Sequence, residues 1–163
     1  MGPIGHVGVA LPVAYAAKLN LPVAFVCALL PDLVDKPLWA LGIGAPRYIA
    51  HTLLLVLLVA AAFSLWKKVY GLSALLGGLS HLLLDWLGGG SPVPWFYPFT
   101  SYDFPTREFD PSSFFSNLFG ALEYNFTLPR VGRELIWIAV MLGVMFLCLR
   151  LHHWYIRRRK QRG

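Results

Sequence analysis

The chain has 163 residues, of which 57% are hydrophobic and 13% charged, and its mean hydropathy is +0.60. This composition lies outside the balance of soluble domains and predicts a single unit that resides in a bilayer. The formal net charge of +6 does not indicate a specific nucleic-acid partner, because much of it is the terminal run RRRKQR, which follows a hydrophobic segment as membrane-surface anchors do.

The first 47 residues predict a helical hairpin followed by a polar turn. The N-terminus lacks a basic region before its apolar stretch, so we expect no cleavable signal. Two short apolar runs, HVGVALPVAYAA and LPVAFVCALLP, form the arms, and the polar pair Lys18 and Asn20 divides them. Pro31 is expected to end the second arm, because proline interrupts helices, and the turn PDLVD begins with it. The sequence leaves open whether this hairpin crosses the bilayer completely.

Three further apolar segments have about the length needed to cross a hydrocarbon core of about 30 Å, which takes roughly 20 residues. They are residues 48–66, 71–87 and 134–155. Residues 88–133 predict an irregular, aromatic-rich loop, in which SSFFSNLFGALEYNF forms an interfacial helix. The predicted fold is an all-α integral membrane helical bundle with an N-terminal hairpin and three transmembrane helices. It is one domain over residues 1–163, divided into 1–47, 48–87, 88–133, 134–156 and the basic tail 157–163.

Basic residues cluster at one set of span ends. Lys67 and Lys68 connect the first two spans, the basic tail follows the last span, and Lys18 lies at the tip of the hairpin. The positive-inside rule makes these ends cytoplasmic. The acidic residues and three histidines fall at the opposite ends or in the loop there: Asp32, Asp35, Asp85, Asp103, Glu108, Asp110, Glu123, Glu134, His6, His51 and His81. The sequence therefore predicts a gathering of histidines and carboxylates at the extracytoplasmic face of the cell membrane.

Five residues of this gathering also have purely structural explanations. His81 and Asp85 lie at positions i and i+4, hence on one helix face, and could form a simple ion pair. His51 could be a buried, hydrogen-bonded histidine, and Asp32 or Asp35 could cap the next helical turn.

A shared metal ion explains the whole set with a single cause. Neutral imidazole and carboxylate are ligands of zinc, manganese and iron, and two carboxylates permit bridging between two ions. Three histidines and two or three aspartates exceed what one tetrahedral ion requires. We therefore expect one or two divalent ions, with zinc as the leading candidate.

Residues around the loop supply candidates for substrate binding. Arg47, one helical turn before a predicted ligand histidine, could bind phosphate oxygens bidentately or pair with Asp32 or Asp35. Arg107 in the loop is a lesser candidate. Trp95 belongs to the aromatic stretch PWFYPF, which either forms an apolar wall for acyl or isoprenoid chains or packs onto the bundle.

The ordered motifs GH, PDLVDKP, RYIAHTLL, GLSHLLLDW and PWFYPF resemble those of the YdjM-like membrane-bound metal-dependent hydrolases over residues 1–100. The resemblance implies a helical membrane protein with these metal ligands: His6, Asp32, His51, His81 and Asp85. That family is in turn distantly similar to the zinc-dependent phospholipases C and the single-strand-specific zinc nucleases. By similarity to their HxxxD pair, His81 binds one ion and Asp85 bridges. The HxxxE pair of the soluble phospholipases has no counterpart after Asp85, so one or two ions are expected rather than three.

We therefore expect a membrane-bound metal-dependent hydrolase, with a phosphoesterase acting on a lipid-linked or membrane-proximal substrate as the leading hypothesis. The expected catalytic residues are Asp35, Arg47 and Asp85. Arg47 would help to neutralise developing charge, and Asp35 would be a further ligand or the general base. The expected partners are membrane lipids and a phosphorylated small substrate, and no specific nucleic acid. The alternative is a non-catalytic metal-binding membrane protein, either a carrier or a scaffold. A bundle whose polar groups merely pair is a second rival. The sequence does not define the natural substrate or the oligomeric state.

Overall fold

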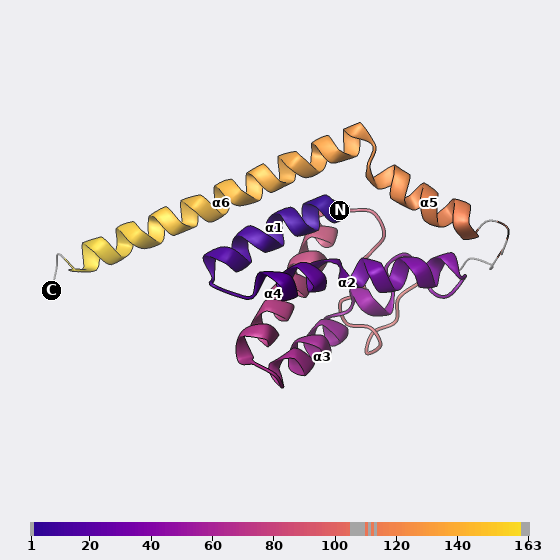
Figure 1. The fold of residues 1–163 in the computed structure, drawn as a ribbon, viewed down its shortest axis with the longest axis horizontal. Helices are drawn as coiled ribbons and strands as arrows, with labels where there is room; N and C mark the ends of the chain where they lie inside the picture. Colours follow the sequence, from indigo (N-terminus) through magenta and orange to yellow (C-terminus); the bar gives the residue numbers. More distant parts are fainter. Residues whose placement is uncertain (1, 105–109, 111, 113, 161–163) are drawn as a thin grey trace.

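The computed structural model describes residues 2–104, 110, 112 and 114–160. Within these residues the chain forms six α-helices and one short 3-10 turn, and it contains no strand (Figure 1). The predicted all-α class is therefore confirmed for this part of the chain. No helix among the described residues combines enough length with enough apolarity to qualify as a membrane span.

The predicted N-terminal hairpin consists of α1, Pro3–Ala16, and α2, Leu21–Ala40. Asn20 caps α2, because its side chain accepts a hydrogen bond of 3.0 Å from the backbone N–H of Val23. The prediction that Pro31 ends the second arm is wrong, since α2 continues to Ala40. A proline removes one hydrogen bond of the helix, but Pro31 is buried in a helix that packs extensively on α4, so tertiary packing outweighs that loss. The motif PDLVDKP is consequently helical.

A second hairpin is formed by α3, Leu53–Ser64, and α4, Lys68–Gly88, which pack on each other and on α2. The expectation that His51 lies early in a helix is wrong, because it ends a 3-10 turn, η1, over Ile49–His51. Thr52 then caps α3 by accepting from the backbone N–H of Leu55 at 3.1 Å. His51 is therefore held by a tight turn directly before a helix.

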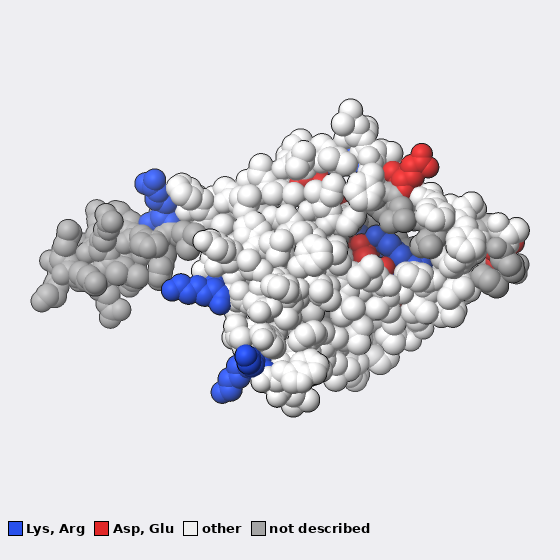
Figure 2. Space-filling view, viewed as in Figure 1, with Lys and Arg blue, Asp and Glu red and all other residues white. Residues whose placement is uncertain are grey.

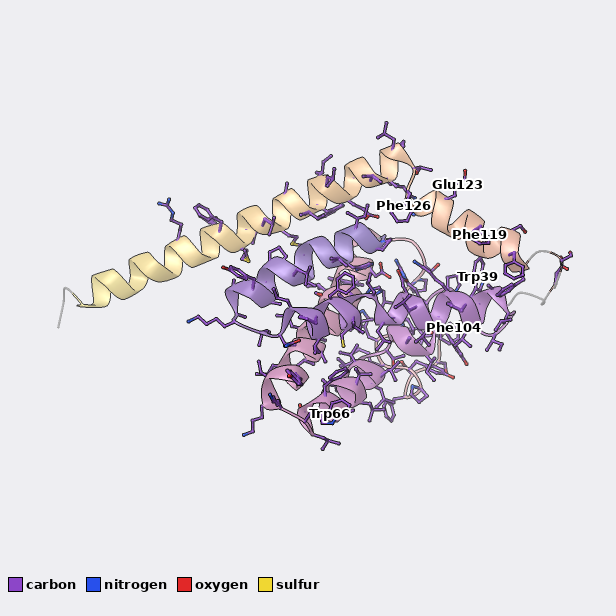
Figure 3. The ribbon with its side chains drawn as sticks, viewed as in Figure 1. Trp39, Trp66, Phe104, Phe119, Glu123 and Phe126 are labelled. Carbon is purple, nitrogen blue, oxygen red and sulfur yellow. The ribbon has the colours of Figure 1, made fainter. Side chains whose placement is uncertain are left out.

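The last two helices are α5, Phe114–Asn125, and α6, Leu128–Lys160. The helix expected in SSFFSNLFGALEYNF is confirmed as α5, which contacts α2 and α6. Figure 3 places Trp39 of α2 near Phe119 of α5, while Glu123 points away from the bundle. The first part of α6 lies along α1, and its other end extends beyond the bundle (Figure 1).

Charged side chains are unevenly distributed over the molecule. Basic side chains protrude at the left and lower edges in Figure 2, where the α1–α2 and α3–α4 turns lie in Figure 1. Acidic atoms appear toward the opposite side of the same face. Many large apolar side chains in between are exposed, among them Leu57, Leu58, Leu72 and Leu83. The fold thus separates a basic end from the end that carries the histidines and carboxylates.

Candidate metal centre

The five predicted ligands meet in one buried cluster. His6 comes from α1, Asp32 from α2, His51 from η1, and His81 and Asp85 from α4. The three histidines are 0% exposed. Their ligand atoms form two overlapping groups, His6 with His81 and Asp85, and Asp32 with His51 and His81, and within each group the atoms lie within 4.8 Å of one another.

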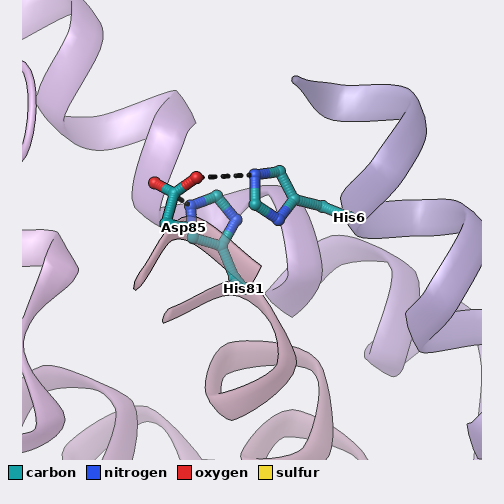
Figure 4. A group of neighbouring side chains, drawn as sticks. All are labelled: His6, His81 and Asp85. Atoms are coloured by element: carbon teal, nitrogen blue, oxygen red, sulfur yellow. Dashed lines mark ion pairs between the residues drawn. The ribbon is translucent and has the colours of Figure 1, made fainter. Parts of the chain in front are cut away.

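The helical spacing of His81 and Asp85 places both side chains toward α1 (Figure 4). The ring of His6 stacks on the ring of His81 with centroids 3.7 Å apart. Nε2 of His6 lies 3.3 Å from Oδ1 of Asp85, and the other oxygen, Oδ2, lies 3.7 Å from Nε2 of His81. Asp85 therefore offers one oxygen to the His6 side of the cluster and one to the other side.

Hydrogen bonds at Nδ1 fix the orientation of two histidine rings. Nδ1 of His81 lies 2.7 Å from the carbonyl oxygen of Ala28, which can only accept, so this nitrogen carries the proton. Nδ1 of His51 lies 2.7 Å from Oδ2 of Asp35 and donates to that carboxylate. The two Nε2 atoms then face each other at 3.2 Å. Two lone pairs at this distance repel each other unless a proton or a cation lies between them.

Oxygens of two aspartates lie near these two nitrogens. Oδ1 of Asp32 lies 3.6 Å from Nε2 of His51 and 3.9 Å from Nε2 of His81. Oδ2 of Asp85 lies 3.4 Å and 3.7 Å from the same two nitrogens. A tetrahedron with metal–ligand bonds of about 2.1 Å has edges of about 3.4 Å. Each aspartate oxygen forms with the two nitrogens a triangle whose edges are close to this length. The nitrogen and oxygen donors also fit zinc, manganese or iron in type.

His81 has one nitrogen to give to a metal, because its Nδ1 is bound to Ala28. It belongs to both groups of candidate ligands, yet it can serve only one ion at a time. Asp32, His51 and His81 form one group that could hold an ion, and Oδ2 of Asp85 lies near the same two histidines. A second ion would have to rely on His6 and the remaining oxygen of Asp85.

Asp35 lies behind His51, on the Nδ1 side of its ring. This fully buried carboxylate accepts hydrogen bonds from the backbone N–H groups of Tyr48 at 2.6 Å, Ala50 at 3.0 Å and His51 at 3.2 Å. It also binds the His51 ring itself. Asp35 was predicted as a spare ligand or a general base, and the structure places it where it holds the turn and orients the His51 ring.

Two cations flank the cluster. Nζ of Lys36 lies 2.6 Å from Oδ2 of Asp32, and Nε of Arg47 lies 2.8 Å from Oδ2 of Asp85. Burial alone would raise the pKa of Asp32, but the neighbouring His51 and the charge of Lys36 outweigh it and hold that pKa below its usual range. The Lys36 side chain is 31% exposed and that of Arg47 is 13% exposed, so the solvent-facing rim of the cluster is basic. Figure 2 shows acidic and basic atoms side by side in a hollow on one face.

Arg47 also ties down the glycine-rich segment that follows α4. Its guanidinium donates to the carbonyl oxygen of Ser91 and, at 3.2 Å, to that of Gly89. Of the alternatives foreseen for Arg47, an ion pair with Asp32 or Asp35 does not occur among its described contacts, and its carboxylate partner is Asp85.

One predicted substrate residue, Trp95, lies outside the cluster. Trp95 packs on the apolar cluster of Val56, Leu82 and Val93, and its carbonyl oxygen accepts from the backbone N–H of Leu53 at 3.0 Å. It therefore contributes to the packing around the start of α3. Arg107 lies outside the described residues.

The sequence reasoning missed two charged residues that the structure brings to the cluster and its supports. The i, i+4 spacing of Asp32 and Lys36 is a helical ion-pair signal, which became visible only once PDLVDKP was known to be helical. Glu134 of α6 is 5% exposed and binds the start of α1. Nothing in the local sequence around Glu134 indicates that contact.

The chain was compared with known proteins. No curated protein and no solved structure matches it significantly. The model of one protein family, described as YdjM inner membrane protein, matches residues 1–157. Because this match covers nearly the whole chain, the protein belongs to the YdjM inner membrane protein family.

Proposed function

We propose that this protein is a membrane-embedded, metal-dependent hydrolase that acts on a phosphoester. One observation carries the proposal: histidine nitrogens and carboxylate oxygens form two overlapping groups, His6 with His81 and Asp85, and Asp32 with His51 and His81, and within each group the ligand atoms lie within 4.8 Å of one another. Membership in a family of inner membrane proteins supports the membrane location.

The residues of the chain have separate roles in this proposal. Asp32, His51, His81 and Asp85 hold the ion, while the Asp35 carboxylate and the Ala28 carbonyl keep the two imidazoles in the correct tautomer. His6 and Oδ1 of Asp85 offer donors for a second ion. A bound divalent ion supplies a hydroxide-like nucleophile near neutral pH and polarises the bond to be cleaved.

The charge of the cluster favours an anionic substrate. Asp32, Asp35 and Asp85 contribute three negative charges, and Lys36 and Arg47 contribute two positive charges. A single divalent ion turns the resulting excess of one negative charge into an excess of one positive charge. The two cations are the more exposed groups, so a phosphate group arriving from outside meets them first. The exposed apolar side chains of the bundle support a lipid-linked or membrane-proximal substrate.

A second function, a non-catalytic metal carrier or scaffold, is favoured by a different observation. Protein donors gathered around fully buried histidines are typical of closed structural zinc sites, whereas catalytic zinc keeps one position for water. Hydrolysis at this centre requires an ion that accepts five or six ligands, or a second ion at His6.

The experiment that separates these functions measures metal content and turnover in the same preparation. The protein is purified in mild detergent, and we expect at least one equivalent of a divalent metal, which His81→Ala loses. Phosphomonoester and phosphodiester substrates should be turned over, and chelator and Asp85→Ala should each abolish that activity. Asp103→Ala removes an exposed carboxylate outside the cluster and serves as the matched control. Bound metal without turnover would support the carrier or scaffold, and absence of metal would contradict both functions.

A further inference from the structure

Helix α1 begins with glycines at the two positions where a helix normally caps itself. Gly2 is the N-cap residue, no side chain caps it, and Gly5 is the third residue of the helix. In a capping box, side chains at these two positions satisfy each other's backbone N–H groups. Glycine has no side chain, so the first turn of α1 cannot satisfy its own amide donors.

A carboxylate from the far end of the sequence takes over this role. Oε1 of Glu134 accepts from the backbone N–H of Gly2 at 2.6 Å, and Oε2 accepts from that of Gly5 at 2.8 Å. Glu134 is buried, and its negative charge lies at the positive end of the α1 helix dipole. One turn further along α6, the side chain of Ile138 packs against Gly8. A Cβ atom added at Gly8 would overlap with Cδ1 of Ile138. Helix α6 thus contacts the first two turns of α1 through the hydrogen bonds of Glu134 and the packing of Ile138.

The start of α1, which Glu134 binds, carries one of the candidate metal ligands. His6 follows Gly5 directly, and its backbone N–H donates to the carbonyl oxygen of Gly2 at 3.3 Å. Its ring stacks on His81 and its Nε2 points at Asp85 (Figure 4). Any change in the path of the first turn would move this ring relative to α4.

We propose that Glu134 is a positioning residue, which acts through the first turn of α1 to hold His6 in the metal centre. This role rests on the proposed metal centre and extends it beyond the ligands to the C-terminal helix. The long helix α6 then completes the centre without contributing a ligand of its own.

The test uses the full chain loaded with Co²⁺, whose visible spectrum reports the number and type of its ligands. We expect Glu134→Gln to lower Co²⁺ affinity by roughly tenfold to a hundredfold, as removal of outer-shell partners does. The visible spectrum of Co²⁺-loaded Glu134→Gln should differ from that of the wild type in the same direction as the spectrum of Co²⁺-loaded His6→Ala. Glu134→Asp keeps a carboxylate and should recover part of the affinity. Glu123→Gln removes an exposed carboxylate of α5 and should behave as the wild type.

The possible outcomes are distinct. A Glu134→Gln protein that melts at a lower temperature, but binds Co²⁺ with wild-type affinity and spectrum, would show that Glu134 is merely structural and would overturn the proposed role. If Glu134→Gln does not fold, Glu134→Asp carries the test, and unchanged affinity together with an unchanged spectrum in that variant overturns the proposal equally. A wild type that binds no Co²⁺ would overturn the metal centre itself.

Discussion

Asp35 is the residue whose contacts define the orientation of His51. Its carboxylate accepts from three backbone N–H groups and from the His51 ring. In Asp35→Asn, an NH2 group replaces one of the two carboxylate oxygens. This group cannot accept a hydrogen bond from the backbone N–H groups or from the His51 ring that bind Asp35. We expect metal affinity to fall by roughly tenfold to a hundredfold. We also expect the free energy of unfolding to fall by about 1–3 kcal/mol, because a buried donor loses its partner.

Metal competition and denaturant unfolding in detergent measure these two effects, with Asp103→Asn as the exposed control. If Asp35→Asn lowered activity while metal affinity stayed unchanged, the general-base role would be supported in place of positioning.

The sequence predicted the members of the cluster better than their contacts. The pair His81 and Asp85 follows from helical spacing, which is a local property of the chain. The contact of Asp35 with the His51 ring depends on how a helix and a turn meet, which local spacing does not define. Glu134 lies more than a hundred positions from its partners Gly2 and Gly5, so the first turn of α1 looks uncapped in the sequence.

Gly77 allows helices α2 and α4 to pack closely against each other. A Cβ atom there would lie 2.5 Å from the carbonyl oxygen of Ala24 and 3.0 Å from the backbone nitrogen of Ala28. Backbone atoms cannot yield as a flexible side chain can, so Gly77→Ala should force α2 away from α4. We expect a loss of about 1–3 kcal/mol in the free energy of unfolding, measured by denaturant titration. Metal affinity should also fall, because Ala28 binds the ring of His81.

The matched control for this prediction is Gly143→Ala in α6. A Cβ atom at Gly143 meets nothing within 4 Å, and alanine favours a helix over glycine by about 1 kcal/mol. Gly143→Ala should therefore leave the free energy of unfolding unchanged or raise it slightly. Equal destabilisation by both substitutions would refute the close approach at Gly77.

Helix order was predictable at the level of elements, whereas two boundaries were not. The hairpin and the helix over residues 71–87 follow from apolar runs and the breaks between them. Pro31 misled the prediction because packing on α4 sustains a helix that the local sequence disfavours. The span expected over residues 48–66 places His51 inside a helix, but the Thr52 cap makes the helix begin after it.

For the molecule as a whole, the positive-inside rule predicts one orientation in a membrane, with the basic turns on the cytoplasmic side. The α1–α2 and α3–α4 turns carry Lys18, Lys67 and Lys68, and the cluster lies at the other ends of these helices. In intact cells, we expect an impermeant thiol reagent to label Ser101→Cys, which follows α4. The reagent should reach Lys67→Cys only after permeabilisation. Both positions are exposed, so access depends on the side of the membrane. Labelling of Lys67→Cys alone in intact cells would reverse the proposed orientation.

The bond between Glu134 and the start of α1 bears on how the chain matures. The amides of Gly2 and Gly5 are synthesised 132 and 129 positions before their partner. While the intervening residues are translated, the first turn of α1 carries backbone donors that Glu134 does not yet satisfy. This cap of α1 therefore forms only after α2, α3 and α4 have been synthesised.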